Sequence, residues 1–292
     1  MRKLDHVLMP FDCLTKAKDR LAGLGFTVAD EARHPFGTAN ACVYFQDETY
    51  LEPLSVYDEA LISKALQEGN TFVAGFTDYR RQFGDDGISS IALKSVDAEG
   101  DHRGFVDAGC SGGEMLTFSR PLKQPDGSVD TASFKLAFSA MASEHGFHLF
   151  TCQRINVPNL AGEGMALHEN CVIGIRRVIL SADHGPSIAH YLSIVMDSEG
   201  NKGVAKTAYS LGDASLEVMP PQAIENELGV LIGDTNGGLR ARAVAFAVHD
   251  VRKAAKLLDA RGIEHSMRDD RLIVPDATGQ GTTFIFEEER HE

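Results

Sequence analysis

Along the first fifty-six positions, the spacing of hydrophobic residues changes from that of a strand to that of a helix and back to that of strands. A short apolar run over 4–9 predicts a strand, and Asp12 is placed to cap a helix that follows. Apolar residues then recur at helical spacing, followed by three predicted strands over 26–28, 41–46 and 49–54. The helical positions are Leu14, Ala17, Leu21 and Leu24. The predicted order is therefore β-α-β-β-β.

The same order of predicted elements returns at the C-terminal end, over 242–287. There Asp250 caps the predicted helix and Gly262 ends it. A further copy fits 175–219, with Pro186 in the first helical turn. The least regular copy covers 88–155. Recurrence of one element order indicates an internal repeat of βαβββ modules.

Four modules make two pairs, because one module alone leaves an apolar face uncovered. The fold class predicted is α+β, with the modules paired into two cup-shaped curved mixed sheets. The predicted domains are 1–160 and 163–292, the second being a degenerate pair. Residues 57–87, which read as partly helical, link the first two modules. The stretch 121–129 reads as a loop insertion because it contains proline and glycine.

The net charge and the number of cysteines limit the kinds of binding partner and the cellular compartment that can be expected. The chain has 292 residues, and 42 acidic against 28 basic side chains give a net charge of −14. Such a field repels phosphate backbones, so nucleic acid is not expected as a partner. The odd number of cysteines, 5, and the absence of a CxxC motif favour a reducing compartment over a disulfide framework. No apolar run is long enough to span a membrane, and the N-terminus lacks a signal peptide. We expect a cytoplasmic, soluble protein.

Several segments together resemble one family. They are Leu-Asp-His-Val at 4–7, Arg-His-Pro-Phe-Gly-Thr-Ala-Asn at 33–40, Tyr-Leu-Glu at 50–52, and the turn and strand over 274–284. In this order they resemble the glyoxalase-like branch of the vicinal-oxygen-chelate superfamily. The resemblance covers nearly the whole chain and is weakest over 95–145. It implies cups that hold a small ligand and, in many members, a divalent metal.

The resemblance assigns metal ligands to the first and last strands of paired modules. His6 and Glu52 match these positions in the first module, and both suit Zn, Ni, Mn or Fe. In the second module the first-strand position falls near Ser90, a poor ligand. His148 by chemistry and Gln153 by position are the candidates on its last strand.

The second pair departs further from the family pattern. Arg177 stands where His6 stands in the first module, and Ala243 takes the corresponding place in the fourth. Glu217 and Glu287 take the position of Glu52. Because an arginine is not a metal ligand, this cup is expected to lack a transition metal. It is then structural, or it binds an anion through Arg177.

Other polar residues have two interpretations each. His34 and Asn40 are candidate catalytic residues at the mouth of the first cup, where His34 would act as general base; ordering of the loop or a turn are the plainer roles. His168 and Asn170, before the third module, contact either a ligand or the chain itself. No GxSxG, GxGxxG, P-loop or HExxH motif occurs, so a nucleotide cofactor is not expected.

Two functions from different classes remain open. One is a metal-dependent lyase, isomerase or dioxygenase whose substrate chelates through two vicinal oxygens. The other is a metal-free protein that sequesters a small ligand in the same cup. His6 and Glu52 favour the enzyme, whereas Ser90, Arg177 and Ala243 favour the binding protein. A third option is a scaffold whose cups are vestigial. The partner of the enzyme and of the binding protein is a small molecule, and a homodimer stays open.

Overall fold

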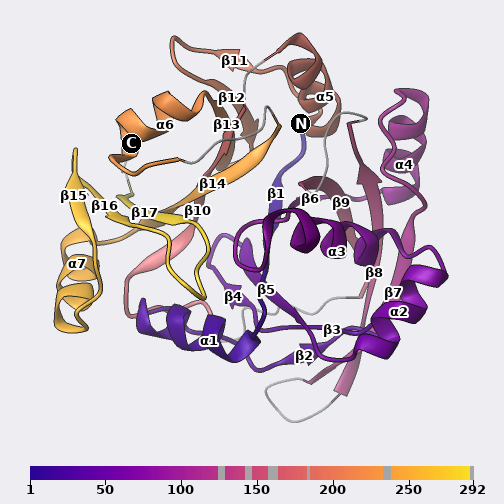
Figure 1. Cartoon of the computed structure of the whole chain (residues 1–292), viewed down its shortest axis with the longest axis horizontal. Coiled ribbons are helices and arrows are strands. Elements are labelled where there is room, and N and C mark those ends of the chain that lie inside the picture. Colours follow the sequence, from indigo (N-terminus) through magenta and orange to yellow (C-terminus); the bar gives the residue numbers. More distant parts are fainter. Residues whose placement is uncertain (124–128, 142–146, 157–163, 183–184, 233–237, 290–292) are drawn as a thin grey trace.

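The computed structural model describes residues 1–123, 129–141, 147–156, 164–182, 185–232 and 238–289. The described residues form two mixed sheets with helices, so the predicted α+β class is confirmed. The N-terminal half builds one sheet and the C-terminal half builds the other (Figure 1). The predicted boundary between 160 and 163 lies outside the described residues, and the division into two domains stays a prediction.

The first sheet has the order β2-β3-β5-β1-β6-β9-β8-β7, and β4 also pairs with β5. Two parallel pairs, β1 with β5 and β6 with β9, meet at the antiparallel pair β1 with β6. Each half of the sheet is thus one βαβββ module. The strands are β1 (Leu4–Pro10), β2 (Ala32–Arg33), β3 (Thr38–Asn40), β4 (Val43–Tyr44), β5 (Tyr50–Val56), β6 (Ser90–Lys94), β7 (Leu116–Lys123), β8 (Val129–Ser139) and β9 (His148–Arg154).

The second sheet repeats this plan in the order β11-β12-β13-β10-β14-β17-β16-β15. Here β10 pairs in parallel with β13 and β14 with β17, and β10 and β14 meet antiparallel. The predicted fourfold repeat is therefore present. The strands are β10 (Val172–Ser181), β11 (Asn201–Lys202), β12 (Thr207–Leu211), β13 (Ala214–Met219), β14 (Arg240–Val248), β15 (Ser266–Arg268), β16 (Arg271–Val274) and β17 (Thr283–Glu288).

Each module has one helix after its first strand. Three further helices cover the cups, two on the first sheet and one on the second. The module helices are α1 (Leu14–Gly23), α4 (Ala98–Asp107), α5 (Pro186–Met196) and α7 (Val251–Ala260). The covering helices are α2 (Glu59–Gln67) and α3 (Thr71–Phe83) on the first sheet and α6 (Pro221–Leu228) on the second. Figure 1 shows α3 lying across the ring of strands formed by the first sheet. None of the helices in the described ranges has the length and apolarity needed to cross a membrane.

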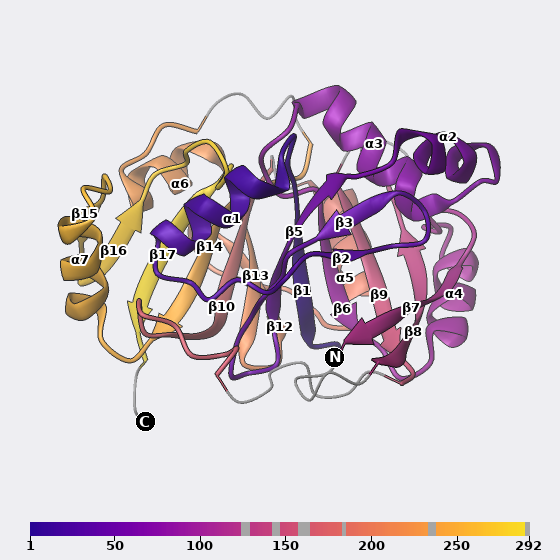
Figure 2. The same ribbon diagram turned by 90° about the horizontal axis from the view of Figure 1, so that it is seen from below.

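The two halves share one large core. Its cluster includes residues from both sheets and from all four module helices. Phe26 connects the two halves within this core. Its ring contacts Phe45 of the first half and the rings of Phe246, Phe284 and Phe286 of the second. Helix α1 lies beside the second sheet (Figure 2), where Arg20 donates to the Gln280 side chain.

Three local predictions were wrong. Residues 26–28 form no strand, because Phe26 serves as a core anchor after the helix turn. The N-cap of α1 is Cys13, and Asp12 instead pairs with Lys16 at 2.8 Å. The predicted loop over 121–129 is shorter than expected, since β7 continues to Lys123 and β8 begins at Val129, and 124–128 lie outside the described residues.

Candidate functional site

His6 and Glu52 lie on the inner face of the first sheet. Strands β1 and β5 pair in parallel with Leu8 opposite Glu52 and His6 opposite Tyr50. Because side chains alternate along a strand, His6 and Glu52 both point into the cup. The imidazole Nε2 lies 3.2 Å from Glu52 Oε2, and the ring stacks on Tyr50 with centroids 4.4 Å apart. The structure therefore brings these two predicted metal ligands together; their role as ligands stays a prediction.

An irregularity in β1 adds a second carboxylate. The register between β1 and β6 shifts between Leu4 and His6, so Asp5 is an extra residue of a bulge. Asp5 is fully buried, and its Oδ2 lies 3.1 Å from His6 Nδ1. Its other oxygen accepts a hydrogen bond from Arg154. His6 is thus held between two carboxylates, one at each ring nitrogen.

These contacts set the charges of the group. Burial opposes protonation of His6, but the hydrogen bonds to Asp5 and Glu52 raise its pKa above the usual value. Burial likewise opposes ionisation of Glu52, yet the hydrogen bond with His6 and the charges of His6 and His34 hold its pKa at about 2. Asp5 has a lowered pKa because its bonds to His6 and Arg154 outweigh burial. Without a bound cation, the site is an imidazolium between two carboxylates.

His34 and Asn40 also converge on Glu52. Asn40 Nδ2 donates to Glu52 Oε1 at 2.5 Å, and His34 Nε2 lies 3.7 Å from the same oxygen. The other His34 nitrogen, Nδ1, is 2.8 Å from Thr38 Oγ1. Both side chains are buried, 5% and 3% exposed, so the expected position at an open mouth was wrong. Burial lowers the pKa of His34 to about 4, which keeps this imidazole neutral at pH 7.

The candidates from the second module do not join this group. His148 pairs with Ser90, and Ser90 with Leu8, in the row that begins at Glu52. Along the sheet, His148 is thus three strand spacings of about 4.8 Å from Glu52. The row of His6 continues instead with Ala92 and Phe150, which carry no ligand atom. The module therefore presents apolar side chains where a facing ligand was expected.

Gln153 points away from the cup, so its assignment as a ligand was wrong. Its amide oxygen accepts a hydrogen bond from Ala98 N at 3.1 Å, and its nitrogen donates to Val96 O at 2.9 Å. Gln153 thus ties β9 to the start of α4 on the outer face of the sheet. The adjacent Cys152, on the inner face, belongs to the cup cluster.

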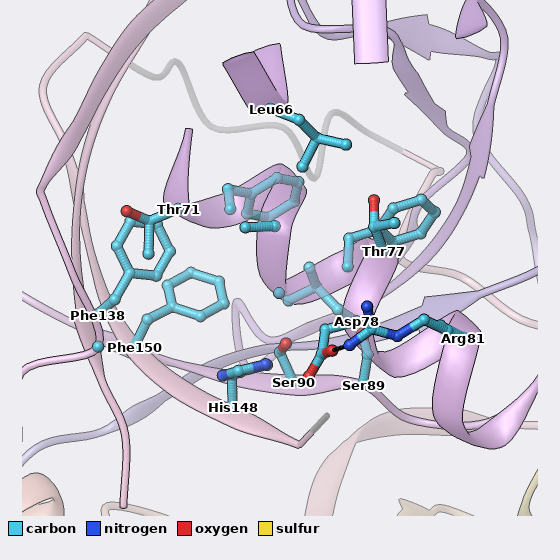
Figure 3. A pocket seen from close by; sticks show the side chains of 16 residues that line it. Leu66, Thr71, Thr77, Asp78, Arg81, Ser89, Ser90, Phe138, His148 and Phe150 are labelled. Carbon is cyan, nitrogen blue, oxygen red and sulfur yellow. Dashed lines mark hydrogen bonds and ion pairs between the residues drawn. The ribbon is translucent and has the colours of Figure 1, made fainter. Parts of the chain in front are cut away.

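Helix α3 divides the cup into two cavities. The smaller, of about 30 Å³, is lined by the polar group around Glu52. The larger, of about 460 Å³, lies between α3 and the ends of β1, β6 and β9. Figure 3 shows His148, Ser90 and Asp78 along the lower edge of the larger cavity, with Leu66 and Thr77 above them. Phe72 and Phe150 line both cavities and separate them.

One lining residue of the smaller cavity was missed by the sequence analysis. Arg120 of β7 is 6% exposed and faces inward together with Phe118, two positions earlier. An arginine at an inward position of an alternating strand is a signal that a sequence can reveal. The signal of Arg120 was missed because the loop predicted over 121–129 left Arg120 outside any predicted strand, whereas β7 continues to Lys123.

The second cup is closed by ion pairs. Arg177 Nη1 lies 2.9 Å from Glu217 and 3.1 Å from Glu227, and its Nη2 pairs with Glu287. Lys206 Nζ approaches Glu217 at 2.7 Å. Arg177 and Glu217 stand in the registers of His6 and Glu52, as predicted. The assignment of Glu287 was wrong, because Ile285 pairs two residues after Ala243 and Glu287 lies farther along β17. The engagement of Arg177 by three carboxylates argues against an anion site there.

His168 and Asn170 bind the chain itself. His168 Nδ1 accepts a hydrogen bond from Thr27 N at 3.0 Å, and Nε2 lies 3.0 Å from Tyr44 O. Asn170 donates to Leu24 O and accepts from Val172 N. Both side chains tie the first module to the start of β10, and neither lines a cavity described above.

The fold is shared with solved structures of low sequence identity. A hypothetical protein from Staphylococcus aureus matches with a TM-score of 0.68 and 14% identity, covering 99% of this chain and 100% of that one. A mutant of 4-hydroxymandelate synthase from Streptomyces coelicolor matches with a TM-score of 0.61 and 13% identity, covering 100% and 94%. The Mn(II)-bound glyoxalase from Novosphingobium aromaticivorans matches with a TM-score of 0.55 and 12% identity, covering 100% and 84%. At these identities the likeness concerns the fold.

A family assignment comes from the sequence comparison. A search of curated proteins gave no significant match. The family model described as a glyoxalase-like domain matches residues 4–195, which contain the whole first sheet and the first strand and helix of the third module. Because this match covers more than half of the sequence, the chain belongs to the glyoxalase-like domain family.

Proposed function

We propose that the first cup is the active site of an enzyme, a lyase, isomerase or dioxygenase, that acts on a small molecule with two neighbouring oxygen atoms. The observation that carries this proposal is the convergence of His6, His34 and Asn40 on one buried carboxylate, Glu52. Buried ionisable groups with shifted pKa values inside a cavity are typical of reactive sites. The position of these residues in a family of such cups supports the same assignment.

A divalent metal fits the donor chemistry of this group. His6 and His34 each engage Nδ1 with a side-chain oxygen, of Asp5 and of Thr38, and turn Nε2 toward Glu52. Such a contact at the second nitrogen orients histidines that bind metals. Within the described ranges, however, no group of three or more His, Cys, Asp or Glu side chains is arranged to hold an ion. His6, His34 and Glu52 are the residues that would hold it, and the ion would polarise the two substrate oxygens.

The protein's own groups supply proton transfer and orientation. In the site without an ion, His6 carries a proton between Asp5 and Glu52 and can donate it from Nε2, and neutral His34 can accept a proton at Nε2. These protons would give way to an ion held by the two Nε2 atoms, and Asp5 and Thr38 would then orient the rings. Asn40 fixes the Glu52 carboxylate, and the rings of Phe72 and Phe150 keep water from the group. Low local polarity strengthens each of these interactions.

A metal-free binding protein is the second candidate. It is favoured by one observation: both Glu52 oxygens already have partners, His6 and Asn40, so the carboxylate needs no cation. In that case the cup would hold its ligand without transforming it. Elemental analysis of untagged protein after dialysis separates the two candidates.

The matched variants are Glu52→Gln and Glu217→Gln, which occupy the same register position in the two sheets. We expect the wild type to retain about one divalent ion per chain, the first variant to lose it and the second to keep it. Metal content that is unchanged in Glu52→Gln, or absent from the wild type, would contradict the metal-dependent function. Ligand binding by metal-free protein would then support the second candidate.

A further inference from the structure

Arg120 is a buried cation that has no ion-pair or hydrogen-bond partner among the described residues. Its side chain is 6% exposed, and its Nε is buried with no hydrogen-bond partner. Over the ranges that the structure describes, Arg120 forms no ion pair or hydrogen bond. Its guanidinium lies over the Phe134 ring, with Cζ 5.9 Å from the ring centroid. A buried charge that lacks a partner is strongly unfavourable, so a ligand or a functional need has to account for it.

The carboxylates of the same cup are already engaged. Glu52 accepts from Asn40 and contacts His6, and Asp5 is bonded to His6 and Arg154. Among the described residues of the cup, no carboxylate is left to pair with Arg120. The other cations that line this cavity, His6 and Arg154, are both paired with Asp5, and the remaining lining groups are aromatic, apolar or uncharged. Arg120 is thus a positive centre that no described residue of the cup neutralises.

From this we infer that Arg120 is the anion receptor of the first cup and that its ligand is a small carboxylate with a second oxygen on the neighbouring carbon, such as a 2-hydroxy or 2-oxo acid. The inference rests on the proposed function, which supplies the need for two neighbouring oxygens. The planar guanidinium fork binds a carboxylate through two parallel hydrogen bonds. The guanidinium lies over the Phe134 ring, which itself stacks on Phe118, and a flat group fits against these flat rings better than a tetrahedral one.

The room for such a ligand comes from both cavities. The cavity at Arg120 has about 30 Å³, room for little more than one water. Phe72 and Phe150 line this cavity and the one of about 460 Å³. A carboxylate at Arg120 therefore extends into the larger space once the Phe72 ring turns aside. The apolar part of the ligand would lie against α3.

The test is calorimetric titration with glycolate and with its neutral analogue glycolamide. The proteins compared are wild type, Arg120→Met and Arg103→Met, the last being an exposed arginine of α4. We expect glycolate to bind wild type and Arg103→Met with equal affinity, and Arg120→Met at least tenfold more weakly. Glycolamide should bind all three proteins weakly and without difference. The assay needs no turnover and no metal, so its outcome is independent of the proposed enzymatic reaction.

Thermal unfolding provides the second readout. An arginine that serves only the fold would make Arg120→Met less stable than wild type. An arginine that serves as a receptor predicts that ligand-free Arg120→Met is at least as stable as wild type, and that glycolate raises the melting temperature of wild type and Arg103→Met but not of Arg120→Met. Equal glycolate affinity in Arg120→Met and wild type, no binding by wild type at millimolar glycolate, or a strongly destabilised Arg120→Met would overturn the inference.

Discussion

Arg177 occupies in β10 the position that His6 occupies in β1. Each precedes by two residues the strand position that pairs with a glutamate, Glu217 in one sheet and Glu52 in the other. Each also contacts that glutamate, at 2.9 Å from Arg177 Nη1 and at 3.2 Å from His6 Nε2. An imidazole can exchange its proton for a metal ion, whereas a guanidinium stays charged. One backbone position thus gives a reactive pair in one cup and a fixed ion pair in the other.

Removal of Arg177 should destabilise the fold. Arg177→Met leaves Glu217, Glu227 and Glu287 facing one another, and we expect the free energy of unfolding to fall by about 3 to 5 kcal/mol at pH 7. Urea unfolding measures this change. Arg176→Met, at the neighbouring position, is the control and should differ little from wild type. The ion-pair interpretation is wrong if the two variants are equally stable.

Acid stability should depend on Glu52. Its pKa, about 2 against an ordinary 4.5, is depressed, so its contribution is complete above about pH 4.5 and is lost as the pH falls toward 2. The shift corresponds to about 3 kcal/mol. Glu52→Gln should lack this part of the acid transition, and it should lower the pKa of His6, which NMR titration of the imidazole reports. An unchanged His6 pKa in the variant would show that the pair is not coupled.

His168 should give a separate pH dependence. Burial lowers its pKa from 6.5 to about 4, although its hydrogen bond to Tyr44 O acts in the opposite direction. Its contribution is therefore complete above about pH 6.5 and is lost as the pH falls through 4. We expect at most about 2 to 3 kcal/mol, since the ring is partly accessible. His168→Gln should flatten the unfolding free energy between these pH values, whereas His249→Gln, an exposed control, should not.

Gly281 should be a critical contact between the halves. Its φ is +65°, and a Cβ added there would lie 2.2 Å from Gly87 N. Gly262 has nearly the same φ, +63°, but open space around it. Gly262→Ala should cost about 1 kcal/mol for the left-handed conformation alone. Gly281→Ala should cost at least about 3 kcal/mol because the backbone must also move. Similar melting temperatures for the two variants would contradict the close approach.

The order of the modules could be predicted because it depends on local spacing. The apolar stripes of α1, α5 and α7, Pro186 at the start of α5 and Asp250 as the cap of α7 all appear in the structure. These features act within one element, so sequence alone contains them. The exceptions are Asp12 and Phe26. Each was assigned a local role, yet one pairs with Lys16 and the other packs against the distant second sheet.

The site could be predicted only in part. Alternation along β1 and β5 placed His6 and Glu52 on one face, and the structure agrees. The facing strand could not be placed, because register decides which of two alternating faces enters the cup. Gln153 turned outward for that reason, and His148 fell in a different row.

By itself, then, the sequence determined the four βαβββ modules, their pairing, the family and the His6–Glu52 pair. Only the tertiary structure decided which groups surround that pair. Asp5 enters through a bulge, His34 through the start of the turn between β2 and β3, Asn40 through β3, and Arg120 through the closing strand β7. Such neighbours are set by strand register and sheet curvature, which depend on the packing of the whole half and leave no periodic mark in any one segment.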